Sequence, residues 1–236
     1  MTTDTHKIVS RTEWLEARKQ LLAREKQFTH ERERLAAARR DLPWVKVTEN
    51  YEFTRARGKA SLADLFDGRS QLVVYHFMFG PDWEAGCKSC SFWADNFNGI
   101  VEHLAHRDVT MVAISRAPLT KLQAYARRLG WAFEWVSSGG TRFNHDLGVS
   151  FTADQLAGGE VDYNYARKKT SSTDLPGISV FYKQGNDVFH TYSCFGRGID
   201  MMNTAYQYLD LVPRGRDEAS PPGPMSWLRR RDEYGV

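Results

Sequence analysis

The segment of residues 72–79 constrains the fold of this chain more than any other. It reads LVVYHFMF, a run of apolar and aromatic residues that only His76 interrupts. A strand that is apolar on both faces is typical of a parallel sheet covered by helices on each side. We therefore expect a central strand of an α/β sheet here, with His76 as a buried core histidine rather than a catalytic base.

Helices and strands alternate after this segment. The apolar spacing predicts a helix over 92–106, a strand over 109–114, a helix over 119–129 and a short strand over 131–136. A strand-helix-strand-helix-strand order predicts a parallel sheet with right-handed crossovers.

Two further strands predict that the central sheet is mixed. The runs ISVFY (178–182) and VFHTYSCF (188–195) are joined by a short turn, which is typical of an antiparallel hairpin. A closing helix is expected over 200–209, and an earlier hairpin is expected around Gly58.

Residues 11–40 are expected to form one long helix. Its apolar side chains recur with seven-residue spacing, at Trp14, Leu21, Phe28 and Leu35. Because this stripe is narrow, we expect the helix to pack on the main domain, with pairing of two subunits in a homodimer as the alternative.

These elements divide the chain into an N-terminal helical extension (1–43), an α/β domain (44–212) and a C-terminal tail (213–236). The domain carries a polar insertion over 152–175 before its C-terminal hairpin, which is typical of a functional loop such as a lid, or of a disordered segment. Two acidic residues directly follow the arginine cluster 229–231, so the tail is expected to be solvated.

Composition excludes several classes of protein. The 236 residues are 42% hydrophobic, which is enough for a sizeable core, and the net charge of only +3 comes from interspersed basic and acidic residues. A nucleic-acid-binding surface needs a basic patch, so no nucleic-acid partner is expected. The N-terminus lacks the apolar region of a signal peptide and no run of about 18 apolar residues occurs, so we expect a cytoplasmic protein without a membrane partner.

The strongest functional signal is the pair Cys87 and Cys90 in the loop FGPDWEAGCKSC, between the central strand and the next helix. Three cysteines in a reducing compartment are too few for a disulfide scaffold, and a close pair there is more often catalytic or metal-binding. Free backbone N–H groups at a helix start stabilise a thiolate, so Cys87 is the candidate nucleophile. Lys88 would support that thiolate, while the acidic residues of the loop would oppose it.

Cys90 is the candidate resolving thiol. A spacing of three residues places the two cysteines on neighbouring positions of one helical turn, within reach of a disulfide. Cys87 would attack a disulfide of a protein or small molecule, and Cys90 would then cleave the mixed disulfide.

A structural zinc site and a pair of inert buried thiols are the alternatives to redox chemistry. A closed zinc site needs four ligands, and the sequence offers only Cys194 as a further cysteine and no second C-x-x-C. Free cysteines are also common in protein cores. We favour redox chemistry and expect neither a metal nor a cofactor.

The topology places candidate substrate contacts near the cysteines, because ligand sites in open α/β sheets lie beyond the carboxyl ends of the parallel strands. Arg116 follows strand 109–114 and would stabilise a thiolate or hold an anionic group, although an ordinary surface arginine fits equally well. Pro176 and Gly177 open an antiparallel strand at the same edge, where exposed backbone would pair with a peptide-like substrate. Trp83 lies in the cysteine loop itself.

A third hypothesis is a non-catalytic binding module. An aromatic-lined mouth near the cysteines would hold a small apolar ligand. The aromatic residues concerned are Phe79, Trp83, Trp93, Tyr163 and Tyr165.

The stretch HFMFGPDWEAGCKSCSFWADNFNG, followed by VAISRAP and LPGISVFY, resembles a bacterial family of thioredoxin-like proteins labelled predicted dithiol-disulfide oxidoreductases. The resemblance extends from WLEARKQLLAREK to SWLRRRDEYG. It implies a thioredoxin-like fold, with Cys87 as the nucleophile, Cys90 as the resolving thiol and Pro176 as the proline at the sheet entry.

The lead-in SLADLFDGRSQLVVYHF is similar, more distantly, to peroxiredoxins, which makes a thiol peroxidase the alternative activity. Peroxiredoxins carry Pro and Thr at the positions that here hold Gly80 and Glu84. This departure disfavours the peroxidase.

Overall fold

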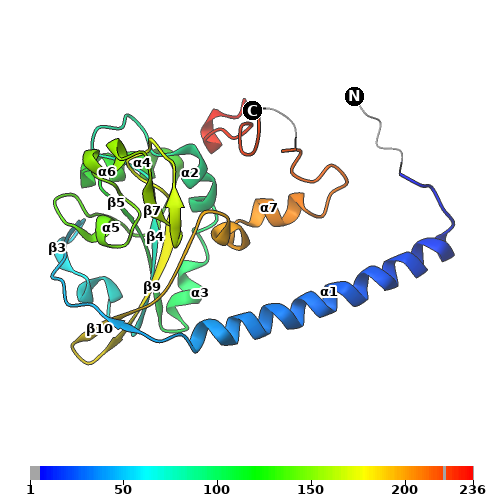
Figure 1. Cartoon of the computed structure of the whole chain (residues 1–236), viewed down its shortest axis with the longest axis horizontal. Helices are drawn as coiled ribbons and strands as arrows, with labels where there is room; N and C mark the ends of the chain where they lie inside the picture. Colours follow the sequence, from blue (N-terminus) through cyan, green and yellow to red (C-terminus); the bar gives the residue numbers. More distant parts are fainter. Residues whose placement is uncertain (1–5, 220–221, 236) are drawn as a thin grey trace. The chain divides into compact units, whose positions relative to one another are not determined.

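The computed structural model describes residues 6–219 and 222–235. The chain divides into two compact units, residues 1–43 and residues 44–236. Figure 1 shows the elements of both units along the chain.

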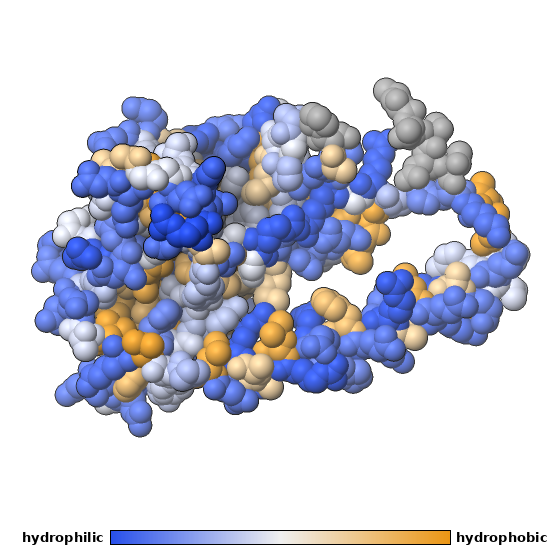
Figure 2. Space-filling model, in the orientation of Figure 1, coloured by the Kyte–Doolittle hydropathy of each residue, from blue (hydrophilic) through white to orange (hydrophobic). Residues whose placement is uncertain are grey.

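The first unit contains one helix, α1 (Arg11–Arg40). The helix begins with a capping box, in which Ser10 accepts a hydrogen bond from the Glu13 N–H and the Glu13 carboxylate accepts one from the Ser10 N–H. The predicted helix is therefore confirmed. Hydrophobic side chains are spaced along this hydrophilic helix (Figure 2), and none of its residues is buried. The packing of its apolar stripe stays a prediction.

The second unit is built on an eight-stranded sheet in the order β1-β10-β9-β4-β5-β6-β2-β3. The strands β4, β5 and β6 are parallel, β9 is antiparallel to β4, and β10 is antiparallel to β9. This arrangement confirms the predicted mixed sheet and thioredoxin-like fold. The bounds are β1 (Val45–Lys46), β2 (Glu52–Arg55), β3 (Gly58–Ser61), β4 (Gln71–His76), β5 (Val109–Ser115), β6 (Trp135–Ser137), β9 (Gly177–Gln184) and β10 (Asp187–Phe195).

The helices of this unit are mostly short. They are α2 (Lys88–Ala94), α3 (Val101–Ala105), α4 (Leu119–Leu129), α5 (Phe143–Asp146), α6 (Ala153–Ala157) and α7 (Thr204–Leu209), with 3-10 turns η1 (Ala63–Phe66), η2 (Gly196–Met202) and η3 (Arg231–Glu233). The predicted helix over 119–129 is confirmed as α4, which Gly130 ends in a left-handed conformation at φ +64°.

Two hydrophobic clusters account for the uninterrupted apolar run of β4. Successive side chains of a strand point to opposite faces, so Tyr75 and Phe77 join one cluster while Leu72 and Val74 join the other. Both faces of the strand are buried, which is why its sequence shows no polar alternation.

The predicted helix over 92–106 is broken. The helix α2 ends at Ala94, turns follow, and α3 begins only at Val101. Gly99 lies between them with φ +84°, a left-handed conformation that an α-helix cannot include. The closing helix predicted over 200–209 is also shorter, because Asn203 caps α7 by accepting a hydrogen bond from the Tyr206 N–H.

The insertion over 152–175 is folded rather than an irregular loop. It contains α6 and a hairpin of β7 (Val161–Tyr163) and β8 (Ala166–Lys168). A third hydrophobic cluster supports it, in which Val161 and Tyr163 pack with Phe195 of the main sheet. The disordered alternative was therefore wrong, because Val161 and Tyr163 anchor the hairpin in a hydrophobic cluster, whereas the role of this segment as a functional loop or lid stays a prediction.

The C-terminal tail was expected to be solvated, and this expectation was wrong. Leu228 is completely buried. The Arg230 guanidinium donates hydrogen bonds to the Tyr125 hydroxyl and to the Gly86 carbonyl, 2.7 and 2.9 Å away. The tail thus packs beside the segment that carries the cysteines. None of the described helices is long and apolar enough to cross a membrane.

Candidate redox site

The loop between β4 and α2 holds Cys87 in a fixed position. The Cys87 N–H donates a hydrogen bond to the Met78 carbonyl at 3.1 Å, and Cys87 is the residue that caps α2. Gly86 precedes it where a Cβ atom would lie 2.7 Å from the Phe77 ring. Only glycine therefore fits at this point without displacing the core.

Cys87 carries the more acidic thiol. A hydrogen bond from the Cys90 thiol is the main cause that lowers the pKa of Cys87 to about 6, and the backbone N–H groups of Cys90 and Ser89 add to it. Burial opposes this shift but does not cancel it. At neutral pH, Cys87 is mostly a thiolate, which is the nucleophilic form.

Cys90 has the opposite character. Its side chain is buried, and its sulfur accepts a hydrogen bond from the Met78 N–H at 3.5 Å. Burial is the main cause that raises the pKa of Cys90 well above its ordinary value, and the neighbouring Cys87 raises it further. Cys90 therefore keeps its proton while Cys87 is ionised. Both cysteines are free thiols.

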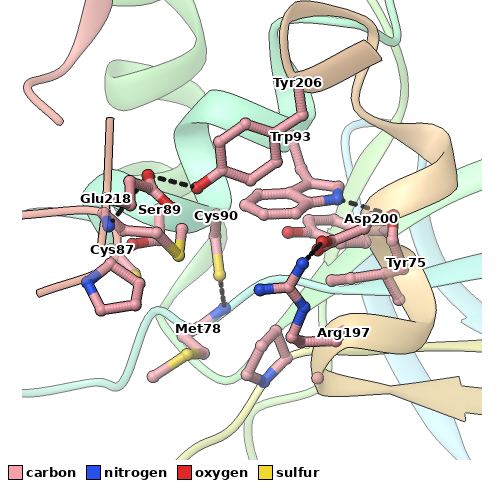
Figure 3. A pocket seen from close by; sticks show the side chains of 15 residues that line it. Tyr75, Met78, Cys87, Ser89, Cys90, Trp93, Arg197, Asp200, Tyr206 and Glu218 are labelled. Atoms are coloured by element: carbon pink, nitrogen blue, oxygen red, sulfur yellow. Dashed lines mark hydrogen bonds and ion pairs between the residues drawn. The ribbon is translucent and has the colours of Figure 1, made fainter. Parts of the chain in front are cut away.

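Both cysteines open into one cavity of about 420 Å³. Figure 3 shows their sulfur atoms close together, with the rings of Trp93 and Tyr206 beside them. The described residues that line the cavity are Tyr75, Met78, Cys87, Ser89, Cys90, Trp93, Pro176, Gly196, Arg197, Ile199, Asp200, Tyr206, Glu218, Pro224 and Met225.

Two aromatic side chains of the wall are held by hydrogen bonds. The Trp93 indole N–H donates to the Ile199 carbonyl at 2.9 Å, which joins α2 to η2. The Tyr206 hydroxyl donates to Glu218 Oε1 at the same distance. These bonds fix the rings that face the cysteines.

The described part of the C-terminal segment, residues 218–219 and 222–228, contributes Glu218, Pro224 and Met225 to the cavity. Glu218 Oε1 accepts hydrogen bonds from the Met225 N–H at 3.0 Å and from the Trp227 indole at 2.7 Å, in addition to Tyr206. Sequence reasoning missed this segment. The signal for it was the pair Trp227 and Leu228, two large apolar residues in an otherwise polar tail.

The structure brings only part of the predicted site together. Cys87, Cys90 and Pro176 line the cavity, whereas Trp83 and Arg116 are not among its described lining residues. The Trp83 ring packs over Gly80, where a Cβ atom would lie 2.8 Å from it.

Arg116 pairs with a carboxylate instead of facing the cavity. Its guanidinium donates two hydrogen bonds, of 2.8 and 2.6 Å, to the buried Asp174 at the end of the insertion. The ordinary structural interpretation of Arg116 therefore fits, and the predicted contact with a thiolate or an anionic substrate does not.

The expected backbone edge at Pro176 and Gly177 is occupied. The Pro176 carbonyl accepts a hydrogen bond from the Tyr163 hydroxyl at 2.6 Å. Gly177 lies within the sheet, opposite His76 on one side and Phe195 on the other. Pairing of a peptide-like substrate at this edge does not fit that arrangement.

Of the predicted aromatic mouth, Trp93 alone is among the described residues that line the cavity. Tyr163 and Tyr165 instead contact the ring of Phe195, with centroids 5.4 and 5.7 Å apart. The aromatic surface near the cysteines comes from Trp93 together with Tyr75 and Tyr206.

His76 is a buried core residue. Its Nε2 lies 2.8 Å from the Ser179 hydroxyl, and burial lowers its pKa to about 3. It is therefore neutral and away from the cysteines. Among the described residues, no group of three or more His, Cys, Asp or Glu side chains is placed to hold a metal ion.

Residues 3–234 match the model of a family described as bacterial proteins of unknown function, DUF899. The chain belongs to this family. The match to DUF899 spans both units of the structure, including α1 and the C-terminal segment. No curated protein matches the chain.

Several solved structures are similar to this DUF899 chain at low sequence identity. The bacterioferritin comigratory protein of Xanthomonas campestris, studied for alkyl peroxide reduction, is 14% identical, with 71% of this chain and 96% of that chain covered and a TM-score of 0.45. The peroxidoxin BcpB of Mycobacterium tuberculosis is 14% identical, with 71% and 97% covered and a TM-score of 0.43. A putative protein disulfide isomerase from Bacteroides thetaiotaomicron is 12% identical, with 70% and 91% covered and a TM-score of 0.39.

Proposed function

We propose that this protein is a dithiol-disulfide oxidoreductase that uses Cys87 and Cys90. The observation that carries the proposal is that two neighbouring thiols in one cavity have opposite pKa shifts and different exposure. Cys87 opens into a cavity with its pKa lowered to about 6, while the pKa of the buried Cys90 is raised. One thiol is ready to attack, and the other retains a proton until it is needed.

The reaction follows from this difference. The Cys87 thiolate attacks one sulfur of a substrate disulfide, forms a mixed disulfide and releases the other sulfur as a thiolate. Cys90 then loses its proton and attacks the Cys87 sulfur, which releases the second substrate thiolate. Two electrons pass from the dithiol to the substrate, and a disulfide between Cys87 and Cys90 remains.

A redox titration tests this function. The purified protein is equilibrated with thiol-disulfide buffers between about −120 and −320 mV, and the state of each cysteine is read by alkylation and mass spectrometry. We expect a disulfide between Cys87 and Cys90 that is lost in both Cys87→Ser and Cys90→Ser. A pair that stays reduced over this whole range would rule out the proposal.

The two other candidate functions give different results in related experiments. A thiol peroxidase would consume hydrogen peroxide through Cys87 much faster than a free thiol of equal pKa does. A non-catalytic binding module would keep its cellular function in both serine variants. We expect neither result.

A further inference from the structure

The sulfur of Cys87 is reached through a concave site. The cavity is assembled from stretches far apart in the sequence, including Pro176 before β9, Gly196 at the start of η2 and Met225 of the C-terminal segment. Cys87 itself is only partly exposed. A reacting sulfur must therefore enter the cavity, which suits a small molecule better than a disulfide on the convex surface of a folded protein.

The wall of the cavity is mainly apolar. It is formed in large part by Tyr75, Met78, Trp93, Ile199, Tyr206 and Met225. When a ligand buries apolar surface against these side chains, that surface leaves water, which favours binding by about 25 cal/mol per Å². The wall thus favours an aromatic or otherwise apolar ligand.

The charged groups of the wall already have hydrogen-bond or ion-pair partners. Asp200 accepts from both Arg197 and Arg216, each at 2.9 Å. Glu218 accepts three hydrogen bonds from the C-terminal segment and α7. The described wall thus contains two carboxylates, Asp200 and Glu218, and one arginine that is paired with Asp200, so an anionic ligand would lose its hydration beside acidic groups.

One polar group of the wall is directed at the thiols. Tyr75 is completely buried, and its hydroxyl has no partner at ordinary hydrogen-bond distance among the described residues; its side-chain hydrogen-bonding interaction is with Cys90. The hydroxyl interacts electrostatically with Cys90 and Cys87, so it lies on the side of the cavity that faces the thiols. A thiol is a weak hydrogen-bonding partner, so a ligand with a nitrogen or oxygen acceptor would satisfy the buried hydroxyl better.

On the basis of the proposed function, we infer that the substrate is a small uncharged disulfide, aromatic or otherwise apolar, with one hydrogen-bond acceptor near the reacting sulfur. Cys87 attacks that sulfur, Tyr75 donates to the acceptor, and the C-terminal segment covers the apolar part. The substrate leaves as two thiols, and its two sulfur atoms have taken up the two electrons of the protein dithiol.

A set of matched disulfides tests this inference. The pre-reduced protein is mixed with dithiodipyridine, which is neutral, aromatic and carries acceptor nitrogens, or with dithiobis(nitrobenzoate), which is aromatic but anionic, or with insulin as a protein disulfide. Each single-turnover rate is divided by the rate of dithiothreitol with the same disulfide, which removes differences in intrinsic reactivity. We expect the corrected rate with dithiodipyridine to be at least about tenfold higher than with either other probe, equivalent to about 1.4 kcal/mol.

Two variants connect that preference to the cavity. Tyr75→Phe is expected to slow dithiodipyridine more than diphenyl disulfide, which has no nitrogen acceptor. Met225→Trp, which narrows the cavity, is expected to slow dithiodipyridine more than dimethyl disulfide. Each variant is judged by the ratio of its rates with two substrates, which does not depend on the amount of folded protein. An unchanged ratio would count against the inference.

The outcomes separate the two proposals. Equal corrected rates for insulin and dithiodipyridine, or for the anionic and neutral probes, would overturn the small-molecule inference and leave the redox function intact. Failure of the redox titration to yield a disulfide between Cys87 and Cys90 would instead remove the function itself.

Discussion

Cys87 and Cys90 are three residues apart, yet their environments move their pKa values in opposite directions. The spacing could be read from the sequence, and with it the assignment of an attacking and a resolving thiol. The size of the pKa difference could not be predicted from the sequence. It depends on the burial of the Cys90 sulfur and on the groups that donate hydrogen bonds to the Cys87 and Cys90 sulfurs. The Met78 N–H, for example, reaches Cys90 from the preceding strand end.

The pH dependence of Cys87 reactivity is a direct prediction of this pair. The rate of iodoacetamide modification at Cys87, followed by peptide mass spectrometry, should rise with pH with a midpoint near the pKa of about 6. Cys90→Ala should move the midpoint upward, because the main cause of the low pKa is the hydrogen bond from Cys90. Cys90→Ser keeps a donor and serves as the control. A midpoint unaffected by either substitution would contradict this account.

The same low pKa predicts how stability depends on pH. The folded pKa of Cys87, about 6, lies below the ordinary thiol value of about 8.5, so the thiolate stabilises the reduced protein fully above pH 8.5 and this stabilisation is lost as the pH falls through 6. The free energy of unfolding of the reduced protein, minus that of Cys87→Ser, should grow by up to about 3 kcal/mol between these pH values. Urea denaturation at several pH values measures it, and a flat difference would refute the prediction.

At the scale of elements, the central strand and the helix over 119–129 were predicted correctly, whereas the helix over 92–106 is broken at Gly99 and two weakly patterned segments were misjudged. The apolar run of β4 and the helical spacing of α4 are local properties, so the sequence was sufficient. The insertion over 152–175 and the C-terminal segment are polar in composition, and each is held by a few side chains that contact distant parts of the chain. Such contacts leave no periodic signal.

Glu218 is predicted to hold the C-terminal segment over the cavity. Glu218→Ala removes the acceptor of three hydrogen bonds, so residues 222–228 should exchange amide hydrogens faster, and a bulky maleimide should reach Cys87 faster. Glu218→Gln retains a side-chain oxygen and is the matched control. If the alanine variant gave unchanged exchange in this segment, the anchoring role would be wrong.

The pair of Arg116 and Asp174 is predicted to hold the end of the insertion. Burial raises the pKa of Asp174, but the hydrogen bonds from Arg116 and Ser150 outweigh it and the net pKa is lowered. Arg116→Met leaves a buried carboxylate unpaired and should cost about 3 kcal/mol of stability, with faster proteolysis within 152–175. Adding Asp174→Asn should recover part of the loss. Additive losses in the double variant would show that the two residues do not act as a pair.

At the scale of the whole molecule, the three hydrophobic clusters of the described residues all lie in residues 44–236. The cavity beside the cysteines draws on residues from Tyr75 to Met225, a separation that explains why the sequence identified the thiols but not most of the surrounding wall. The reacting pair is local, whereas its surroundings exist only after folding.

Because the clusters lie in one unit, a protein of residues 44–236 is predicted to fold without α1. Its thermal transition should remain cooperative, and the reduction potential of the Cys87 and Cys90 pair should match that of the full chain within error. Calorimetry and the redox titration make this comparison. Loss of a cooperative transition would show that α1 contributes to the core of the second unit.

The contribution of Glu218, Pro224 and Met225 to the cavity has an evolutionary consequence under the proposed function. The thiols sit on a sheet-anchored loop, whereas this part of the wall comes from the far end of the polypeptide. Relatives could therefore acquire new substrates by drift at the C-terminus while the cysteine loop stays constant. Exchanging this segment alone between family members would be a direct route to redesigning what the dithiol reduces.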